Sequence, residues 1–396
     1  MASFSVRFLG CKISHTDAHA VRERLLRDGH LETDGPADVA VVNTCCVTHE
    51  AVRKSRHAAA RAARMHARVY VTGCGANLGG AAFAGLPENV RVIARPSETT
   101  PELVARDVGA IGCTRAEAKL DRIRAFVKVQ DGCSFSCNFC VIPLVRGPSR
   151  SRSAEAVLAE VRRRVEQGHR EVVLTGINLG CYRDRAAGYR LPRLIREVGA
   201  TPGLARLRLS SIEVNHVNAE LVEALVETPV VSRHLHVPLQ SGDDSMLRAM
   251  GRRYSAATYL RRVAGLERFN LTTDVIVGFP GEDEGAFGNT MAVISEARIT
   301  KVHVFPYSPR PGTVTAAEDT VPAAVKKERS ARLRAASEAA CRRHWRRKLG
   351  RNDIVLVDRP GRGYGDDYSP WLVEAPVGEF VRVRAAAVLE EGILAA

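Results

Sequence analysis

The sequence predicts an α/β protein with three parts: an N-terminal parallel sheet, a central open barrel of six β/α units and a small C-terminal β-barrel. Three observations lead to this prediction. Short strands rich in β-branched residues alternate with helical segments through the first hundred residues. The same alternation resumes at residue 124 and gives six further strands. After residue 350 the strands are short and are separated by glycine-rich turns.

Each of three N-terminal strands is followed directly by a cysteine. The strands cover residues 5–10, 38–44 and 68–73, and the cysteines are Cys11, Cys45 and Cys74. Because the carboxyl ends of parallel strands share one edge of the sheet, we expect the three thiols to converge there. Thiolates are ligands of iron–sulfur clusters and zinc. The alternative is that these cysteines are ordinary residues of buried strands.

The central region contains six strands, too few to close an eight-stranded barrel, so an open (β/α)6 partial barrel follows. Its strands are expected at 124–129, 171–175, 206–210, 234–237, 272–277 and 301–305. Helical patterns fill most of the gaps, at 153–167, 218–227, 255–267 and 283–297. Ligands should bind at the carboxyl ends of these strands.

Polar residues and glycines follow three of these strands. They are Thr175, Gly176, Asn178, Glu213 and Gln240. Glycine lets the backbone approach a ligand closely, and polar side chains at this edge could bind ribose hydroxyls or an amine. We expect them to contact a cofactor, although each could also be an ordinary loop residue.

Three more cysteines, Cys133, Cys137 and Cys140, lie in one loop directly after the first barrel strand. A loop this short can supply three ligands to a four-iron cluster and leave one iron open. Structural zinc is the alternative, but it normally needs four ligands, and no second pair of cysteines lies nearby.

This Cys-x3-Cys-x2-Cys pattern, with Phe139 before the last cysteine, resembles the signature of the radical S-adenosylmethionine (SAM) enzymes. The N-terminal motifs Gly10-Cys11-Lys12, Asn43-Thr44-Cys45 and Thr72-Gly73-Cys74 are similar to those of one branch, the methylthiotransferases. The resemblance extends from about residue 4 to residue 315.

The sequence departs from that family in two places. Ser14-His15 stand where Asn-Gln is usual, and Cys46 occupies a position that is typically Thr or Ser. The doublet makes the ligand ambiguous, and Cys45 is preferred because it completes Asn-Thr-Cys. Since successive strand side chains face opposite sides, we expect Cys46 to point away from the cysteine cluster.

The resemblance implies a flavodoxin-like N-terminal domain, a radical SAM core and a terminal RNA-binding barrel of the TRAM type. It implies SAM and two [4Fe–4S] clusters, one on each cysteine set, with no catalytic residue identified beyond the cluster ligands. In the implied mechanism a 5′-deoxyadenosyl radical removes a hydrogen atom from the substrate, and the second cluster presents a methylated sulfur. An electron donor such as a flavodoxin or ferredoxin is implied as a partner.

The substrate is also inferred from resemblance. Gly10-Cys11-Lys12 and Lys54-Ser55-Arg56 look most like the branch that acts on N6-threonylcarbamoyladenosine at position 37 of tRNA and adds a methylthio group to C2. The branch that acts on isopentenyladenosine, and one that modifies an aspartate of a ribosomal protein, are the alternatives. A non-catalytic iron–sulfur RNA-binding protein would not need an open iron together with a second cysteine set.

We expect four segments. They are an N-terminal domain with the second cluster at 1–110, the radical SAM core at 120–320, a basic connecting helix at 321–349 and the TRAM-like domain at 350–396. A linker with one short helix is expected between about 95 and 124. The helix carries ten Lys or Arg residues and could bind phosphates or serve as a solvated connector.

Composition limits the remaining possibilities. The 396 residues include 58 Lys or Arg against 44 Asp or Glu, a net charge of +14 that favours a polyanionic partner. A coding bias toward arginine would give the same excess. We find no secretion signal and no apolar stretch long enough to span a membrane. Ten cysteines without a signal peptide favour reduced thiols, metal binding and a cytoplasmic location.

Overall fold

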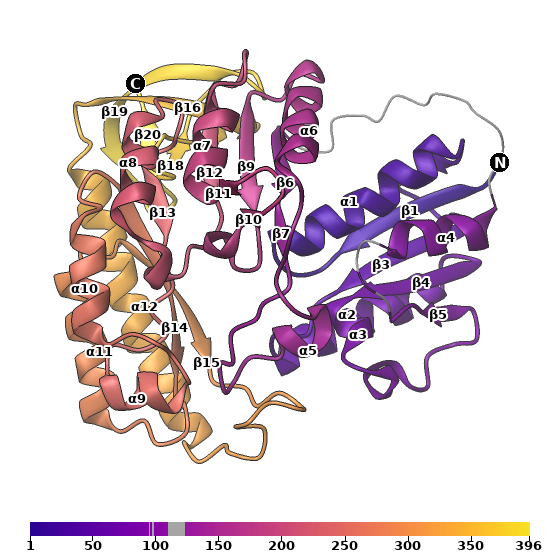
Figure 1. Cartoon of the computed structure of the whole chain (residues 1–396), viewed down its shortest axis with the longest axis horizontal. Coiled ribbons are helices and arrows are strands. Elements are labelled where there is room, and N and C mark those ends of the chain that lie inside the picture. The colour runs from indigo at the N-terminus through magenta and orange to yellow at the C-terminus, as the bar shows by residue number, and fades with distance from the viewer. Residues whose placement is uncertain (95, 97–98, 110–122) are drawn as a thin grey trace. The chain divides into compact units, whose positions relative to one another are not determined.

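A computed structural model describes the whole chain except residues 95, 97–98 and 110–122 (Figure 1). Contacts divide the chain into two compact units. Unit 1 comprises Met1–Asp121, Asp131–Arg150 and Ser308–Ala317, and unit 2 comprises Arg122–Gln130, Ser151–Tyr307 and Glu318–Ala396. The cysteine loop is thus grouped with the N-terminal sheet. The domain boundaries inferred from the sequence stay predictions.

Unit 1 is built on a parallel sheet with the strand order β2-β1-β3-β4-β5. Its strands are β1 (Ser3–Phe8), β2 (Leu31–Glu32), β3 (Val39–Thr44), β4 (Arg68–Gly73) and β5 (Val90–Val92). Phe8 is in register with Asn43, and Thr44 with Gly73. The three strands that precede cysteines are therefore neighbours and end at nearly the same level, as predicted.

Helices cover both faces of this sheet. Successive strand residues point to opposite faces, and the residues on both faces are apolar. Val41 packs with residues of α1 (Lys12–Arg27) and α4 (Thr100–Val108), whereas Val42 packs with residues of α2 (His49–Ala63). The short α4 lies in the predicted linker, whose remainder falls largely outside the described residues together with Cys113. Unit 1 also contains α3 (Cys74–Asn77), η1 (Gly80–Phe83) and α5 (Ile142–Arg146).

Unit 2 contains the six predicted barrel strands (Figure 1). Strands β6 (Arg124–Lys128), β9 (Glu171–Thr175) and β12 (Arg206–Leu209) form one parallel sheet; β13 (His234–His236), β14 (Asn270–Val277) and β15 (Lys301–Pro306) form the other. An isolated bridge between Leu207 and Val231 continues the first sheet toward the second. One large apolar core, which includes Val127, Leu174 and Val275, lies beneath both sheets. The fold therefore confirms the open partial barrel.

The helices of unit 2 begin where the sequence supplies a capping side chain. The predicted helices correspond to α6 (Ala154–Glu166), α8 (Ala219–Glu227), α10 (Ala256–Ala264) and α11 (Glu284–Glu296). Their N-caps are Ser, Asn, Ser and Asp, and each accepts a backbone hydrogen bond. The remaining elements are α7 (Leu191–Gly199), α9 (Asp244–Ala249), η2 (Leu179–Cys181), η3 (Val214–His216), β10 (Arg183–Asp184) and β11 (Tyr189–Arg190). The short strands β7 (Gln130–Asp131) and β8 (Arg150–Ser151) bracket the cysteine loop in sequence.

The C-terminal region is the predicted helix α12 (Ala323–Arg346) followed by a closed five-stranded barrel. Its strands are β16 (Asn352–Arg359), β17 (Arg362–Tyr364), β18 (Pro370–Leu372), β19 (Phe380–Val388) and β20 (Ile393–Ala395). The sequence analysis missed β17 and β20. Each has only three residues, too few to show a period, and pairing with its neighbours decides its conformation.

Buried arginines attach this small barrel to the amino-terminal edge of the partial barrel. Arg206 donates to the carbonyl of Ile354 at 2.6 Å, and Arg208 donates to that of Gly365 at 2.7 Å. Both arginines also pair with the buried Glu171. Burial alone would raise the pKa of this carboxyl, but the surrounding guanidinium groups outweigh that effect and lower it. The small barrel therefore lies at the edge opposite the carboxyl ends of the strands. None of the helices described here is long and apolar enough to cross a membrane.

Candidate active site

The three cysteines that follow strands of unit 1 lie close together at the carboxyl edge of the sheet. Cys11 caps the start of α1, Cys45 follows β3, and Cys74 is the first residue of α3. Burial, together with smaller contributions from neighbouring Cys74 and Cys11, raises the pKa of the Cys45 thiol to about 11. A residue larger than glycine at Gly10 would come within 3.3 Å of the Cys45 sulfur. The expected convergence is therefore present.

Cys46 does not point away from this cluster, so that expectation is wrong. Its thiol donates a hydrogen bond to the Cys74 sulfur, and this bond, with burial, raises the pKa of Cys46. The same bond lowers the pKa of Cys74 to about 7, against the effect of burial and with help from the Arg146 guanidinium. The alternation rule fails because β3 ends at Thr44, so both cysteines lie beyond the strand.

Arg146, six residues after Cys140, contacts Cys74 of the other cysteine set. Arg146 is the last residue of α5. Two other residues of this helix, Val145 and Ile142, pack with Cys46 and Cys74 in an apolar cluster. Its Nε donates to the Cys74 sulfur at 2.9 Å, and its Nη atoms donate to Asp131 and Asp17 at 2.9 and 2.8 Å. Both carboxylates are buried. These ion pairs hold the pKa of Arg146 above its ordinary value despite burial.

The loop that carries Cys133, Cys137 and Cys140 is fixed by its backbone. Gly132 has a φ of 68°, and a Cβ atom there would lie 2.1 Å from the carbonyl oxygen of Pro148. Glycine is therefore required at this position. The Cys133 N–H donates to Gly147, and Thr315 donates to the Asn138 carbonyl from its backbone and from its hydroxyl.

All three thiols of this loop are partly exposed, and the nine cysteines in the described part of the chain form no disulfide. Three accessible thiols on a short, fixed loop suit a cluster that leaves one iron open to a ligand. The residues present therefore fit a [4Fe–4S] cluster at Cys133, Cys137 and Cys140.

In unit 2, the predicted cofactor residues lie at the carboxyl edge of the barrel strands. The backbone N–H of Asn178 donates to Gln130 Oε1 at 2.9 Å, and that of Gly176 donates to the Ser210 hydroxyl at 3.1 Å. The Thr175 hydroxyl donates to a backbone carbonyl. Asn178 Oδ1 is buried and has no hydrogen-bond partner among the described residues. A buried acceptor without a donor is what a cofactor hydroxyl or amine would satisfy.

Glu213 and Gln240 are held in different ways, Glu213 by contacts of its side chain and Gln240 by an unusual backbone conformation. Glu213 accepts from the backbone N–H of Asn215 at 2.9 Å and pairs with Arg252 at 3.2 Å, so part of its acceptor capacity is used. Gln240 has a φ of 66°, a left-handed conformation that is uncommon for a residue other than glycine. Strain of this kind often marks a residue that is held in place for a ligand.

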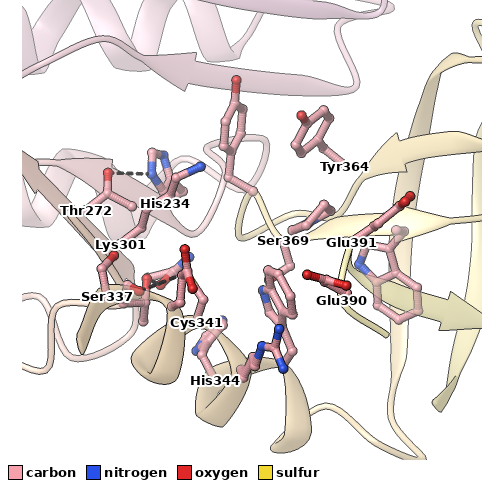
Figure 2. Close-up of a pocket in the computed structure, with 18 of the residues that line it drawn as sticks. His234, Thr272, Lys301, Ser337, Cys341, His344, Tyr364, Ser369, Glu390 and Glu391 are labelled. Carbon is pink, nitrogen blue, oxygen red and sulfur yellow. Dashed lines mark hydrogen bonds between the residues drawn. The ribbon is translucent and has the colours of Figure 1, made fainter. Parts of the chain in front are cut away.

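A pocket of about 530 Å³ lies at the opposite edge of unit 2 (Figure 2). It is lined by His234, Lys301, Ser337, Tyr364 and Ser369, among others, from the first residues of β13 and β15, from α12 and from the small barrel. The active site is expected at the carboxyl edge. This pocket is therefore not the candidate active site.

The sequence analysis missed several residues of the site. It assigned no role to Arg146, Asp17, Asp131 or Gln130. Asp17 lies on the first helix, 129 residues before Arg146, and no spacing rule relates two positions so far apart. A charged residue shortly after the cysteine loop was the only signal that the sequence offered.

Comparisons with known proteins agree with this geometry. Residues 127–294 match the radical SAM superfamily, and residues 3–94 match a family described as uncharacterized protein family UPF0004. The computed structure is similar to a radical SAM methyltransferase, TsrM, from Kitasatospora setae, solved with cobalamin and a [4Fe–4S] cluster bound. The TM-score is 0.59 at 14% identity, over 80% of this chain and 77% of that one. At this identity the likeness shows the fold alone.

The fold and the three-cysteine loop thus define a radical SAM enzyme, whose cofactors are SAM and a [4Fe–4S] cluster. Relatives extend the comparison over the whole chain. The threonylcarbamoyladenosine tRNA methylthiotransferases MtaB of Chlamydia pneumoniae and Thermotoga maritima are 34% and 33% identical, over 99% and 100% of this chain and 97% and 96% of their own lengths. A tRNA-2-methylthio-N(6)-dimethylallyladenosine synthase of Sorangium cellulosum is 35% identical over 92% of this chain and 84% of its own length. The chain belongs to the radical SAM methylthiotransferase family.

Proposed function

We propose that this enzyme adds a methylthio group to C2 of N6-threonylcarbamoyladenosine at position 37 of tRNA. The observation that carries this proposal is the end-to-end match to relatives named for that substrate, at 96–97% of their own length for the two quoted above. The relative named for dimethylallyladenosine has a similar identity but is covered over 84% of its length. That isopentenyl-type substrate is the second candidate.

The proposal includes a second [4Fe–4S] cluster on Cys11, Cys45 and Cys74. Three converging thiols at the carboxyl edge of one sheet support it, together with the positive charge that Arg146 places beside Cys74. When bound, the cluster of the cysteine loop supplies one-electron cleavage of SAM, and the second cluster supplies sulfur.

The roles of individual residues follow from their contacts. Arg146 orients Cys74 and neutralises the thiolate charge, because its guanidinium is itself fixed by Asp17 and Asp131. Asn178, through its unpartnered oxygen, and Gln240, through its constrained backbone, would orient SAM, with Thr175, Gly176 and Glu213 forming the rest of that edge. The substrate tRNA, a small electron-donor protein and a cytoplasmic location complete the proposal.

The test is mass spectrometry of tRNA nucleosides. A strain that lacks the gene should accumulate unmodified N6-threonylcarbamoyladenosine, and the wild-type gene, but not a Cys133→Ala variant, should restore the 2-methylthio form. Loss of the 2-methylthio form of isopentenyladenosine instead would support the second candidate. Unchanged tRNA in the deletion strain would overturn both and would favour a protein substrate.

A further inference from the structure

One face of the second barrel sheet carries a cluster of histidine and carboxylate side chains. His236 is the last residue of β13, and it is in register with Thr272 of β14. Asp274 of β14 is in register with His303 of β15. The residues that alternate with them, such as Leu235, Val275 and Val302, are buried in the apolar core. Because side chains alternate along a strand, the polar residues share the opposite face.

Three potential metal ligands of this face lie close together. One nitrogen each of His236 and His303 and one carboxylate oxygen of Asp274 all lie within 4.8 Å of one another. His236 Nε2 is 3.2 Å from Asp274 Oδ1, and the two imidazole rings are 5.4 Å apart. Ligands of one ion with bonds of about 2.1 Å can be no more than about 4.2 Å apart, so binding requires only a small inward movement.

The second ring nitrogen of His236, Nδ1, lies within hydrogen-bond distance of a threonine hydroxyl. His236 Nδ1 lies 2.9 Å from the Thr272 hydroxyl, which also lies 3.0 Å from His234 Nε2 (Figure 2 shows the His234 bond). Histidine ligands of metals usually make such a bond through the ring nitrogen that does not bind the ion, because it fixes the ring and its tautomer. Thr272 therefore leaves Nε2 of His236 directed at Asp274.

We propose that His236, Asp274 and His303 bind one divalent transition-metal cation. Two imidazoles and one carboxylate suit zinc, iron(II), cobalt or manganese rather than calcium or magnesium, and no thiolate takes part. The ligands range from buried His236 to exposed His303, so the remaining coordination positions face an accessible side. These positions would accept water or an oxygen donor such as a carboxylate. The site lies outside the proposed function, which assigns these residues no step.

Manganese(II) is the probe that separates this site from the cysteine clusters, because it prefers oxygen and imidazole ligands to thiolates. The full-length enzyme with its clusters reconstituted is titrated anaerobically, without SAM or tRNA, and free manganese is measured by its six-line EPR signal. We expect about one tight equivalent per chain. Zinc should displace it, because zinc binds the same ligands more strongly.

Two variants remove one ligand each. Asp274→Asn is nearly isosteric, and His303→Ala changes an exposed side chain, so both should fold; iron content and circular dichroism must match the wild type. Each should weaken manganese binding by at least about tenfold, since even loss of an outer-sphere partner costs that much. His57→Ala, on the exposed face of α2, is the matched control and should bind as the wild type does.

Two results would overturn the site. One is the absence of tight manganese binding in the wild type, which would make the cluster a hydrogen-bonded polar group only. The other is equal binding by the wild type and the two ligand variants. Neither result depends on which nucleoside the enzyme modifies, so failure of this proposal is distinguishable from failure of the proposed function.

Discussion

The Arg146 guanidinium donates a hydrogen bond to the Cys74 sulfur at 2.9 Å. Arg146 follows the loop of one cysteine set by only six residues, whereas Cys74 belongs to the other set. The same guanidinium is held by two buried carboxylates, Asp17 and Asp131. A single side chain near the end of one cysteine loop is therefore in direct contact with a cysteine of the other set.

The first prediction concerns this arginine. Arg146→Met should lower the free energy of unfolding by about 3–5 kcal/mol, because it leaves two buried carboxylates without their partner. Arg146→Lys should retain part of the stability but not the bidentate geometry. Urea unfolding monitored by circular dichroism measures the first effect, and iron analysis after reconstitution measures loss of the cluster beside Cys74.

Arg53→Met is the matched control, because Arg53 pairs with Glu50 on the exposed surface of α2. It should leave both stability and iron content nearly unchanged, as expected for a solvent-exposed pair. If Arg146→Met unfolds as the wild type does and binds the same amount of iron, the guanidinium does not organise the site.

The second prediction separates the two clusters. The reconstituted wild type should contain about eight irons, and a Cys133→Ala/Cys137→Ala/Cys140→Ala variant about half, with no cleavage of SAM. A Cys11→Ala/Cys45→Ala/Cys74→Ala variant should also contain about half, yet still form 5′-deoxyadenosine and make no methylthio product. Full iron content in either variant, or loss of both activities in the second, would refute this division of labour.

The third prediction concerns the cysteine doublet. Cys46→Ser should retain activity, because a hydroxyl can donate the hydrogen bond that the Cys46 thiol gives to Cys74. Cys45→Ser should lose activity and the iron of one cluster, since Cys45 is the thiol beside both Cys11 and Cys74. Measured activities in the opposite order would show that Cys46 is the ligand.

Sequence patterns were sufficient for the parts of the fold that local periodicity determines. The three strands that precede Cys11, Cys45 and Cys74, and the six barrel strands, were predicted because the spacing of apolar residues is a local signal. Parallel topology then brings the strand ends together, so the candidate ligands followed. The end of this strand at residue 44 was also predicted correctly, but Cys46 was placed wrongly because the alternation of side chains was extended to two cysteines that lie beyond the strand.

Ion pairs between residues far apart in the sequence could not be predicted from such local patterns. The sequence shows ten cationic residues on the basic helix but does not show which of them face the protein. Lys326 and Arg329 of α12 are buried, the first against Asp319 and the second paired with Glu282 at 2.7 Å. These two cations stabilise unit 2 and are not available to a polyanion.

The last prediction tests the remaining cations of that helix. Six basic residues of α12 and the segment just after it are exposed and make no ion pair within the described parts of the chain: Lys327, Arg334, Arg342, Arg343, Arg346 and Arg347. If they neutralise tRNA phosphates, replacing Arg342, Arg343, Arg346 and Arg347 by Gln should weaken tRNA binding. The plot of log affinity against log salt should also become flatter, by about 0.7–0.9 for each phosphate that the protein no longer neutralises.

Point variants are preferable to removing the helix, because α12 also supports the barrel: Ser337 accepts a hydrogen bond from the backbone of Val302 at 2.9 Å. The control removes the same charge elsewhere in unit 2, by changing exposed Arg162, Arg185, Arg261 and Arg268 to Gln. It should leave the salt slope near that of the wild type. Equal slopes for both variants and the wild type would show that α12 is a solvated connector. A large loss of affinity in the control alone would show that cations outside α12 hold the tRNA.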